Sequence, residues 1–260
     1  MQTRNNRGVV LLIHGLWLRP GIWDAWLDEL DEAGYDATVL SWNESDQSPG
    51  SRPGAVAGFD GLFRTARQCA RTLRPRPIVI GHGVGGAVAE RLLAGGDAAA
   101  AISLAPVPGG RAAIPAAAGL LLGHSRIALL SLSGSPVVPS FAQFRRTMAI
   151  VSDPSAARRF YAEFVVAGRP RDVLLPVLRR RVPVRGRPSR RGPLLLAAGG
   201  KDQLIREMSI AARHRRYRRH QPDAVTDYQV FPELDHTLGL GTQGRALLFY
   251  CLDWLTAHDL

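Results

Sequence analysis

The chain has 260 residues, of which 46% are hydrophobic and 21% are charged, and its formal net charge is +11. This length and composition suit one large domain, or a domain with an insertion, and they exclude a chain that is disordered throughout. The two cysteines, Cys69 and Cys251, lie far apart in the sequence, which excludes a disulfide scaffold or a zinc site built from cysteines. We expect both to be core residues, because each lies in an apolar helical pattern.

We expect no secretion signal at the start of the sequence. Residues 1–8 contain two arginines and lead directly into an apolar run at Val9, without a long hydrophobic region and a small-residue cleavage site. The longest apolar tract, residues 112–132, is interrupted by Pro115, two glycines and Arg126. We therefore expect a cytoplasmic protein with no transmembrane segment.

Short apolar runs alternate with helical patterns along the first 108 residues. The run 9–13 is rich in β-branched residues, as is typical of a strand buried on both faces. Residues 22–33 then place Trp23 and Trp26 at helical spacing and end before Gly34. The pattern continues with predicted strands at 37–40, 77–80 and 100–104 and predicted helices at 59–73 and 84–94. Such βαβ alternation predicts a mostly parallel sheet.

The alternation breaks between residues 109 and 191. Helical stretches there, including 141–148 and 154–166, are separated by proline and glycine and are not accompanied by clear strands. Strand and helix patterns resume with strands at 193–198 and 225–231 and helices at 206–219 and 243–256. We therefore predict a core formed by residues 1–108 and 192–260, with residues 109–191 inserted as a basic helical lid.

The positive charge is concentrated in the predicted lid. Residues 109–191 contain 15 arginines and three acidic residues, whereas the rest of the chain has 18 basic and 19 acidic residues. Seven of the arginines fall within residues 179–191, which we interpret as a basic loop. This loop is either a solvated tether or a surface that attracts an anionic substrate or an acidic carrier protein. We expect no nucleic-acid partner, because the sequence has no recognition motif or aromatic platform for one.

Residues 78–90 contain the most informative motif. A strand pattern, a sharp turn and a helix pattern follow one another, as in a nucleophile elbow with the usual sequence Gly-x-Ser-x-Gly. The turn reads Gly-His-Gly-Val-Gly-Gly, so Gly83 stands where the serine would be. Glycine has no side-chain atom that could attack a carbonyl, so no covalent acyl-enzyme can form at this position. Alternatively, Gly83 is a relaxed relic of the strained turn, or a deliberate replacement that traps substrate.

Three other segments complete a resemblance to the α/β-hydrolase superfamily. Residues 9–17 resemble the strand and His-Gly loop that supplies an oxyanion-hole amide, residues 194–202 the strand that ends in the catalytic acid, and residues 231–236 the loop with the catalytic histidine. The chain order of elbow, acid and histidine is that of the family. The resemblance spans nearly the whole chain and implies an α/β-hydrolase fold, with helices flanking the sheet and an inserted helical lid. It also implies that the first two strands of the family are missing, since only eight residues precede the first predicted strand.

The resemblance implies a role for four positions. Asp202 would orient and charge His236, and the backbone N–H groups of Leu16 and Val84 would form an oxyanion hole. The departure at Gly83 makes ordinary ester, amide or thioester hydrolysis doubtful.

Two alternative site residues are weaker. Asp235 is a poorer candidate for the acid because adjacent side chains usually point apart. Ser103 could act as a displaced nucleophile, but side chains in the middle of a strand usually pack rather than react.

The candidate pocket residues are His14, Trp17, His82, Phe141 and Phe144. The two histidines flank the expected pocket, although hydrogen bonding within loops explains them as well. The lid aromatics are divided between lid core and pocket wall. The seven histidines are scattered, without a carboxylate cluster on one helix face, so we expect neither a metal site nor another cofactor.

These features favour an enzyme that uses non-covalent acid–base and oxyanion-hole chemistry on a largely apolar small molecule. Cyclisation, elimination, isomerisation or a related rearrangement in specialised metabolism fits this description. A second possibility is a hydrolase in which His236 activates water towards an ester, lactone or epoxide. A third is a non-catalytic protein that binds a ligand or partner through the same pocket and the basic lid.

Overall fold

The computed structural model describes residues 7–42, 58–109, 136–171, 191–241 and 245–260. These residues contain a six-stranded sheet with the order β2-β1-β3-β4-β5-β6, in which every neighbouring pair is parallel. The strands are β1 (Gly8–Ile13), β2 (Tyr35–Leu40), β3 (Ile78–His82), β4 (Ala100–Leu104), β5 (Leu194–Gly199) and β6 (Thr226–Phe231). The predicted α/β class and parallel sheet are confirmed.

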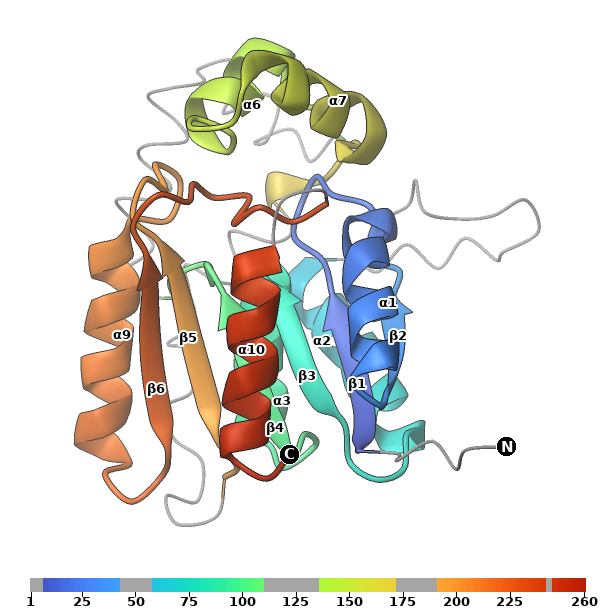
Figure 1. Cartoon of the computed structure of the whole chain (residues 1–260), viewed down its shortest axis with the longest axis vertical. Helices are drawn as coiled ribbons and strands as arrows, with labels where there is room; N and C mark the ends of the chain where they lie inside the picture. Colours follow the sequence, from blue (N-terminus) through green and yellow to red (C-terminus); the bar gives the residue numbers. More distant parts are fainter. Residues whose placement is uncertain (1–6, 43–57, 110–135, 172–190, 242–244) are drawn as a thin grey trace.

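Helices cover both faces of the sheet (Figure 1). They are the 3-10 helix η1 (Pro20–Trp23) and the α-helices α1 (Asp24–Glu32), α2 (Gly58–Thr72), α3 (Val84–Ala94), α6 (Phe141–Thr147), α7 (Pro154–Phe164), α9 (Glu207–His220) and α10 (Arg245–Ala257). In Figure 1, α1 and α10 lie on the near face, whereas α2 and α3 lie on the far face. All predicted elements are found, with ends within two residues of those expected.

The core follows directly from this layering. Strands β1, β3, β4 and β5 are buried along their whole length because helices cover them on both sides. The edge strands β2 and β6 contain partly exposed positions. Cys251 is buried in α10, where burial raises the pKa of its thiol, and half-buried Cys69 packs against the core from α2. The prediction that both cysteines are core residues is confirmed for Cys251, whereas Cys69 is only partly buried.

Helices α6 and α7 lie beyond the carboxyl ends of the strands (Figure 1). Ser140 caps α6, since its side chain accepts a hydrogen bond from the backbone of Gln143, and the Gln143 side chain accepts one in return. The apolar faces of the two helices meet in an aromatic cluster, with Phe144 stacked on Phe160 at 5.7 Å between ring centroids. The apolar tract 112–132 and residues 179–190 of the predicted basic loop lie outside the described residues. No described helix is both long and apolar enough to cross a membrane.

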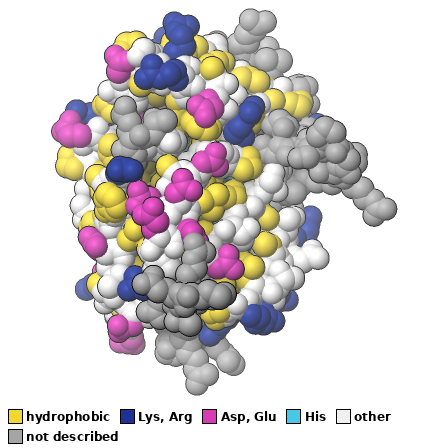
Figure 2. All heavy atoms as spheres, turned by 45° about the vertical axis from the view of Figure 1, so that its right-hand side comes forward, with side chains coloured by type: hydrophobic (Ala, Val, Ile, Leu, Met, Phe, Trp, Pro, Cys, Tyr) yellow, Lys and Arg dark blue, Asp and Glu magenta, His cyan; other side chains and the backbone are white. Residues whose placement is uncertain are grey.

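Charge is distributed unevenly between two helices of the core. Helix α1 carries five acidic residues and no basic residue, whereas α9 carries five arginines and one acidic residue. Figure 2, in which the α1 side of the molecule comes forward, shows Asp and Glu side chains along the middle of that face. The net charge of the core is therefore close to zero although α1 is acidic and α9 is basic.

Candidate functional site

The turn after β3 has the geometry of a sharp elbow. Gly83 adopts φ 58° and ψ −110° and joins β3 directly to α3. A Cβ on Gly81 would lie 2.2 Å from the carbonyl oxygen of Gly85, and a Cβ on Gly85 would lie 2.2 Å from that of Ile13. The glycines on both sides of the turn are therefore required for close packing of α3 on the sheet.

An imidazole–carboxylate pair lies beside this elbow. His236 Nδ1–H donates to Asp202 Oδ2 at 2.7 Å, and both side chains are almost fully buried. The other oxygen of Asp202 accepts the backbone N–H groups of Leu204 at 2.8 Å and Ile205 at 2.7 Å. Because the carboxylate needs the proton on Nδ1, neutral His236 carries its lone pair on Nε2.

Gly83 faces that lone pair. An ideal Cβ on Gly83 would lie 4.0 Å from His236 Nε2 and 3.8 Å from Gly15 Cα, both ordinary van der Waals distances. The elbow, the histidine loop and the His-Gly loop after β1 therefore meet at one point. A side chain at position 83 would have room there and would point towards the imidazole.

The two proposed oxyanion donors follow Gly15 and Gly83 directly in the chain. Val84 is the first residue of α3, where a backbone N–H has no acceptor within the helix. Leu16 follows Gly15 in the loop after β1, and the next residue, Trp17, has a positive φ of 65°. Leu16 and Val84 are both buried. Their role as donors to a substrate oxygen stays a prediction.

His82 holds the histidine loop in place. Its Nε2–H donates to the backbone oxygen of His236 at 2.8 Å, and the two rings lie 4.8 Å apart between centroids. His82 is fully buried, and desolvation lowers its pKa to about 3, so the ring is neutral near pH 7. This contact favours the hydrogen-bonding interpretation of His82 over direct contact with a substrate.

The low pKa of His82 has a measurable effect on stability. The folded pKa of about 3 lies below the ordinary value of 6.5, so the unfolded chain takes up the proton first as the pH falls. The stability due to neutral His82 is therefore complete above pH 6.5 and is lost as the pH falls towards 3. We expect His82→Gln to make the free energy of unfolding less dependent on pH by about 1.4 kcal/mol per pH unit between about pH 6 and 4.

Urea unfolding at several pH values measures this slope. The exposed His220 on α9 provides the control, because His220→Gln removes a histidine without removing a buried one. If the free energy of unfolding depended equally on pH in His82→Gln and in the unmodified chain, His82 would take up its proton at the same pH in the folded and unfolded states. That result would contradict a lowered pKa.

The remaining pocket candidates have packing partners. His14 is fully buried, stacks on Trp42 at 5.3 Å between centroids and forms a 3.0 Å hydrogen bond from Nδ1 to Gly15 O. Phe144 is fully buried in the aromatic cluster, whereas half-buried Phe141 meets the edge of Tyr161. Trp17 is buried as well. Contact of these residues with a ligand stays a prediction.

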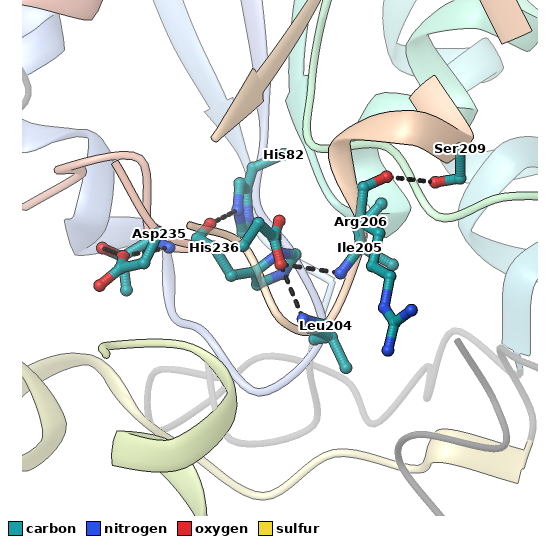
Figure 3. Close-up of polar contacts among 9 residues, drawn as sticks. His82, Leu204, Ile205, Arg206, Ser209, Asp235 and His236 are labelled. Carbon is teal, nitrogen blue, oxygen red and sulfur yellow. Dashed lines mark hydrogen bonds and ion pairs between the residues drawn. The ribbon is translucent and has the colours of Figure 1, made fainter. Parts of the chain in front are cut away.

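The two weaker candidates have other partners. Asp235 points away from the imidazole (Figure 3) and accepts the N–H groups of Val151 at 3.1 Å and Thr237 at 3.0 Å. Ser103 is fully buried in β4, where its hydroxyl donates to Glu90 at 2.8 Å. Neither arrangement fits a catalytic acid or an accessible nucleophile.

The sequence did not predict the backbone hydrogen bonds that connect the α6–α7 segment to the site. On one side, Thr237 N–H donates to Met148 O at 3.2 Å, beside the Asp235–Val151 contact. On the other, Val166 N–H donates to Trp17 O at 2.8 Å. The α6–α7 segment is therefore hydrogen-bonded to both the histidine loop and the proposed oxyanion loop. No local sequence signal marks these backbone contacts.

Solved structures share the fold at low sequence identity. A methylesterase from Arabidopsis is 16% identical with a TM-score of 0.65, and the match covers 96% of this chain and 99% of that one. A monoacylglycerol lipase from Paleococcus ferrophilus is 18% identical with a TM-score of 0.67, with 97% and 95% covered. A thermophilic esterase from Thermogutta terrifontis is 15% identical with a TM-score of 0.69, with 97% and 90% covered.

No curated protein matches the chain. The family model described as "Alpha/beta hydrolase family" matches residues 10–247, which include the elbow, Asp202 and His236. The chain therefore belongs to the alpha/beta hydrolase family.

Proposed function

We propose that this protein is an enzyme that performs acid–base chemistry on a carbonyl compound without a covalent intermediate. The observation that carries the proposal is the pairing of a buried, oriented His236–Asp202 dyad with a glycine at the elbow position that faces it. The Asp202 carboxylate is held by three hydrogen bonds and fixes the imidazole so that Nε2 points towards Gly83, which is the arrangement that a general base needs.

The chemistry follows from the atoms that meet at the elbow. Nε2 of neutral His236 takes a proton from a carbon next to the substrate carbonyl, and Asp202 stabilises the imidazolium that forms. The N–H groups of Leu16 and Val84 bind the enolate oxygen. Return of the proton to another carbon gives isomerisation. If a group on the β-carbon leaves with the bonding electrons and takes the proton from the imidazolium, the result is elimination. If the enolate carbon attacks a second carbonyl carbon of the same molecule, whose oxygen takes that proton, the result is cyclisation.

The proposed substrate is a largely apolar small molecule. The aromatic cluster of α6 and α7 lies on the side of the strand ends that carry the dyad, and we propose that residues 109–191 form a lid over the core of residues 1–108 and 192–260. The similar solved structures are an esterase, a methylesterase and a lipase, which fits a substrate with a carbonyl group. Arginines of this segment, including exposed Arg158 and Arg159, suit an anionic substrate or an acidic carrier protein.

A second candidate function is hydrolysis by water that His236 activates. Its support is the ordinary van der Waals spacing around the ideal Cβ of Gly83, which leaves room beside Nε2 for a small nucleophile. An ester, lactone or epoxide would be the substrate. The two candidates share the dyad and differ in whether a carbon acid or water loses the proton.

Solvent deuterium exchange distinguishes them without knowledge of the natural substrate. We expect the protein to catalyse deuterium incorporation next to the carbonyl of an apolar ketone, with 2-tetralone in D₂O as the probe and NMR as the readout. Exchange without hydrolysis of p-nitrophenyl butyrate supports the first candidate, and hydrolysis without exchange supports the second. Absence of both activities contradicts an enzymatic role on apolar carbonyl compounds.

Asp202→Asn tests the role of the acid. We expect the exchange rate to fall by about 10²–10⁴-fold, because an amide can hold the imidazole in the wrong tautomer and cannot stabilise its cation. Asp227→Asn is the matched control, since Asp227 contacts His258 at 3.1 Å in a second His–Asp pair away from the elbow. Equal rates for the two variants would show that Asp202 has only a structural role.

A further inference from the structure

A buried polar cluster connects α3, the helix that follows the elbow, to β4 and α9. Glu90 of α3 accepts Arg213 Nη1 of α9 at 2.6 Å and the Ser103 hydroxyl at 2.8 Å on one oxygen, and the Tyr217 hydroxyl at 2.8 Å on the other. The Glu90 and Arg213 side chains are 0% and 7% exposed. Burial and the Glu90 carboxylate raise the pKa of Tyr217 well above its ordinary value, so its hydroxyl remains a donor. Such a fully bonded cluster holds its members in one arrangement.

A chain of hydrogen bonds joins this cluster to the elbow. Arg213 Nη2 donates to the backbone oxygen of Val107 at 2.6 Å, and Val107 N–H donates to the Gly83 oxygen at 3.1 Å. In a trans peptide the C=O and the following N–H point in opposite directions. Fixing the Gly83 oxygen therefore also fixes the direction of the Val84 N–H.

The same arginine connects the elbow to the proposed acid. Helix α9 begins at Glu207, shortly after Leu204 and Ile205, whose N–H groups bind Asp202. Arg213, further along α9, therefore links the segment that carries Asp202 to α3. Because Gly83 has no Cβ that restricts its backbone dihedral angles, contacts from neighbouring segments contribute more to the conformation of this elbow.

We propose that Arg213 and Glu90 are positioning residues that set the direction of the Val84 N–H and the location of Gly83 relative to His236. Neither touches the reacting atoms. They act through Val107, whose N–H and C=O groups connect the guanidinium to the elbow peptide. The inference rests on the proposed role of the Val84 N–H, but it is tested without any turnover.

The test uses a thiol at the elbow as a reporter. Gly83→Cys, made together with Cys69→Ala, places a sulfur beside His236 Nε2 and the start of α3, where a thiolate is stabilised. Buried Cys251, whose pKa is raised, remains protonated. Alkylation by iodoacetamide at several pH values gives the pKa of the new thiol, with mass spectrometry of the peptide that contains position 83 as the readout.

The decisive variant is Arg213→Met combined with Glu90→Met. Replacing both members of a buried pair with apolar residues leaves no unpaired charge, but the Ser103 and Tyr217 hydroxyls lose their acceptor, so circular dichroism first checks that the variant is folded. The backbone oxygen of Val107 then no longer accepts a hydrogen bond from a guanidinium. We expect the pKa of the reporter thiol to rise by about one unit, so that alkylation near pH 6 becomes roughly tenfold slower.

Asp97→Asn is the matched control. Asp97 pairs with Arg67 at 2.8 Å and Arg71 at 2.7 Å, so its replacement breaks two ion pairs, neither of which involves Val107. We expect this variant to leave the alkylation profile of the reporter unchanged. A folded Arg213→Met, Glu90→Met variant with the same profile as the reporter alone would overturn the proposal.

A second measurement does not depend on the reporter. In the chain with Gly83, the amide of Val84 should shift in NMR spectra and exchange more rapidly with solvent in the double variant than in Asp97→Asn. Unchanged Val84 shifts and exchange would also overturn the proposal. Because neither measurement involves a substrate, failure of the proposed enzymatic function leaves this test valid.

Discussion

Replacing Gly83 with serine is expected to create esterase activity towards p-nitrophenyl butyrate, at least about 10³-fold above that of the chain with glycine. The ideal Cβ of residue 83 lies 4.0 Å from His236 Nε2, so an Oγ one bond further out comes within hydrogen-bond reach of that nitrogen. Asp202 already holds the imidazole in the tautomer that accepts the hydroxyl proton. A burst of p-nitrophenol equal in amount to the protein would report the acyl-enzyme.

Gly83→Ala is the control for this variant. Alanine adds the same Cβ at the same positive φ of 58°, but it supplies no nucleophile. We expect Gly83→Ala to hydrolyse the ester no faster than the chain with glycine. If serine and alanine gave equal rates in folded protein, the site would not be that of a hydrolase which lacks only its nucleophile.

Replacing His236 with alanine is expected to reduce the proposed deuterium exchange of 2-tetralone by about 10²–10⁴-fold. The imidazole is the only group shown to face Gly83 with a free lone pair among the residues that the structure describes. Without it, Asp202 is left as a buried carboxylate with no base between it and the substrate. NMR measures the exchange rate at one pH, which gives the loss of activity. Rates at a series of pH values show how that loss depends on ionisation.

His258→Ala is the matched control, because His258 contacts Asp227 outside the elbow region. Its exchange rate should equal that of the unmodified chain. Exogenous imidazole is expected to restore part of the activity of His236→Ala, since it can enter the space left by the side chain. Turnover that is unaffected by His236→Ala would exclude acid–base catalysis by the dyad and favour a binding role.

The order and type of the elements were predictable from local patterns. Continuous apolar runs such as 9–13 and 100–104 indicate strands buried on both faces, and their alternation with helices allows little except a parallel sheet. The elbow was recognisable because its glycines are spaced for close packing of a helix on a strand. Asp202 and His236 are candidates because each lies in a short segment after a strand that resembles a motif of the family.

Other parts of the site carry no such motif. Glu90 and Arg213 lie 123 residues apart on two helices whose sequences do not show that they face each other. His82 was expected near a pocket, whereas its partner is a backbone oxygen of residue 236, 154 residues away. Backbone contacts between the α6–α7 segment and the two site loops were also invisible, since they need no particular side chain.

The sequence by itself determined the secondary structure, the parallel sheet, the candidate dyad and the chemical limit set by glycine at position 83. Those properties depend on local periodicity, on turn chemistry and on which atoms a residue possesses. Tertiary structure decided that Gly83 faces His236 Nε2, that His82 is neutral and supports the histidine loop, and that Arg213 reaches the elbow through Val107. These depend on burial and on distances between remote segments, which exist only once the chain has packed.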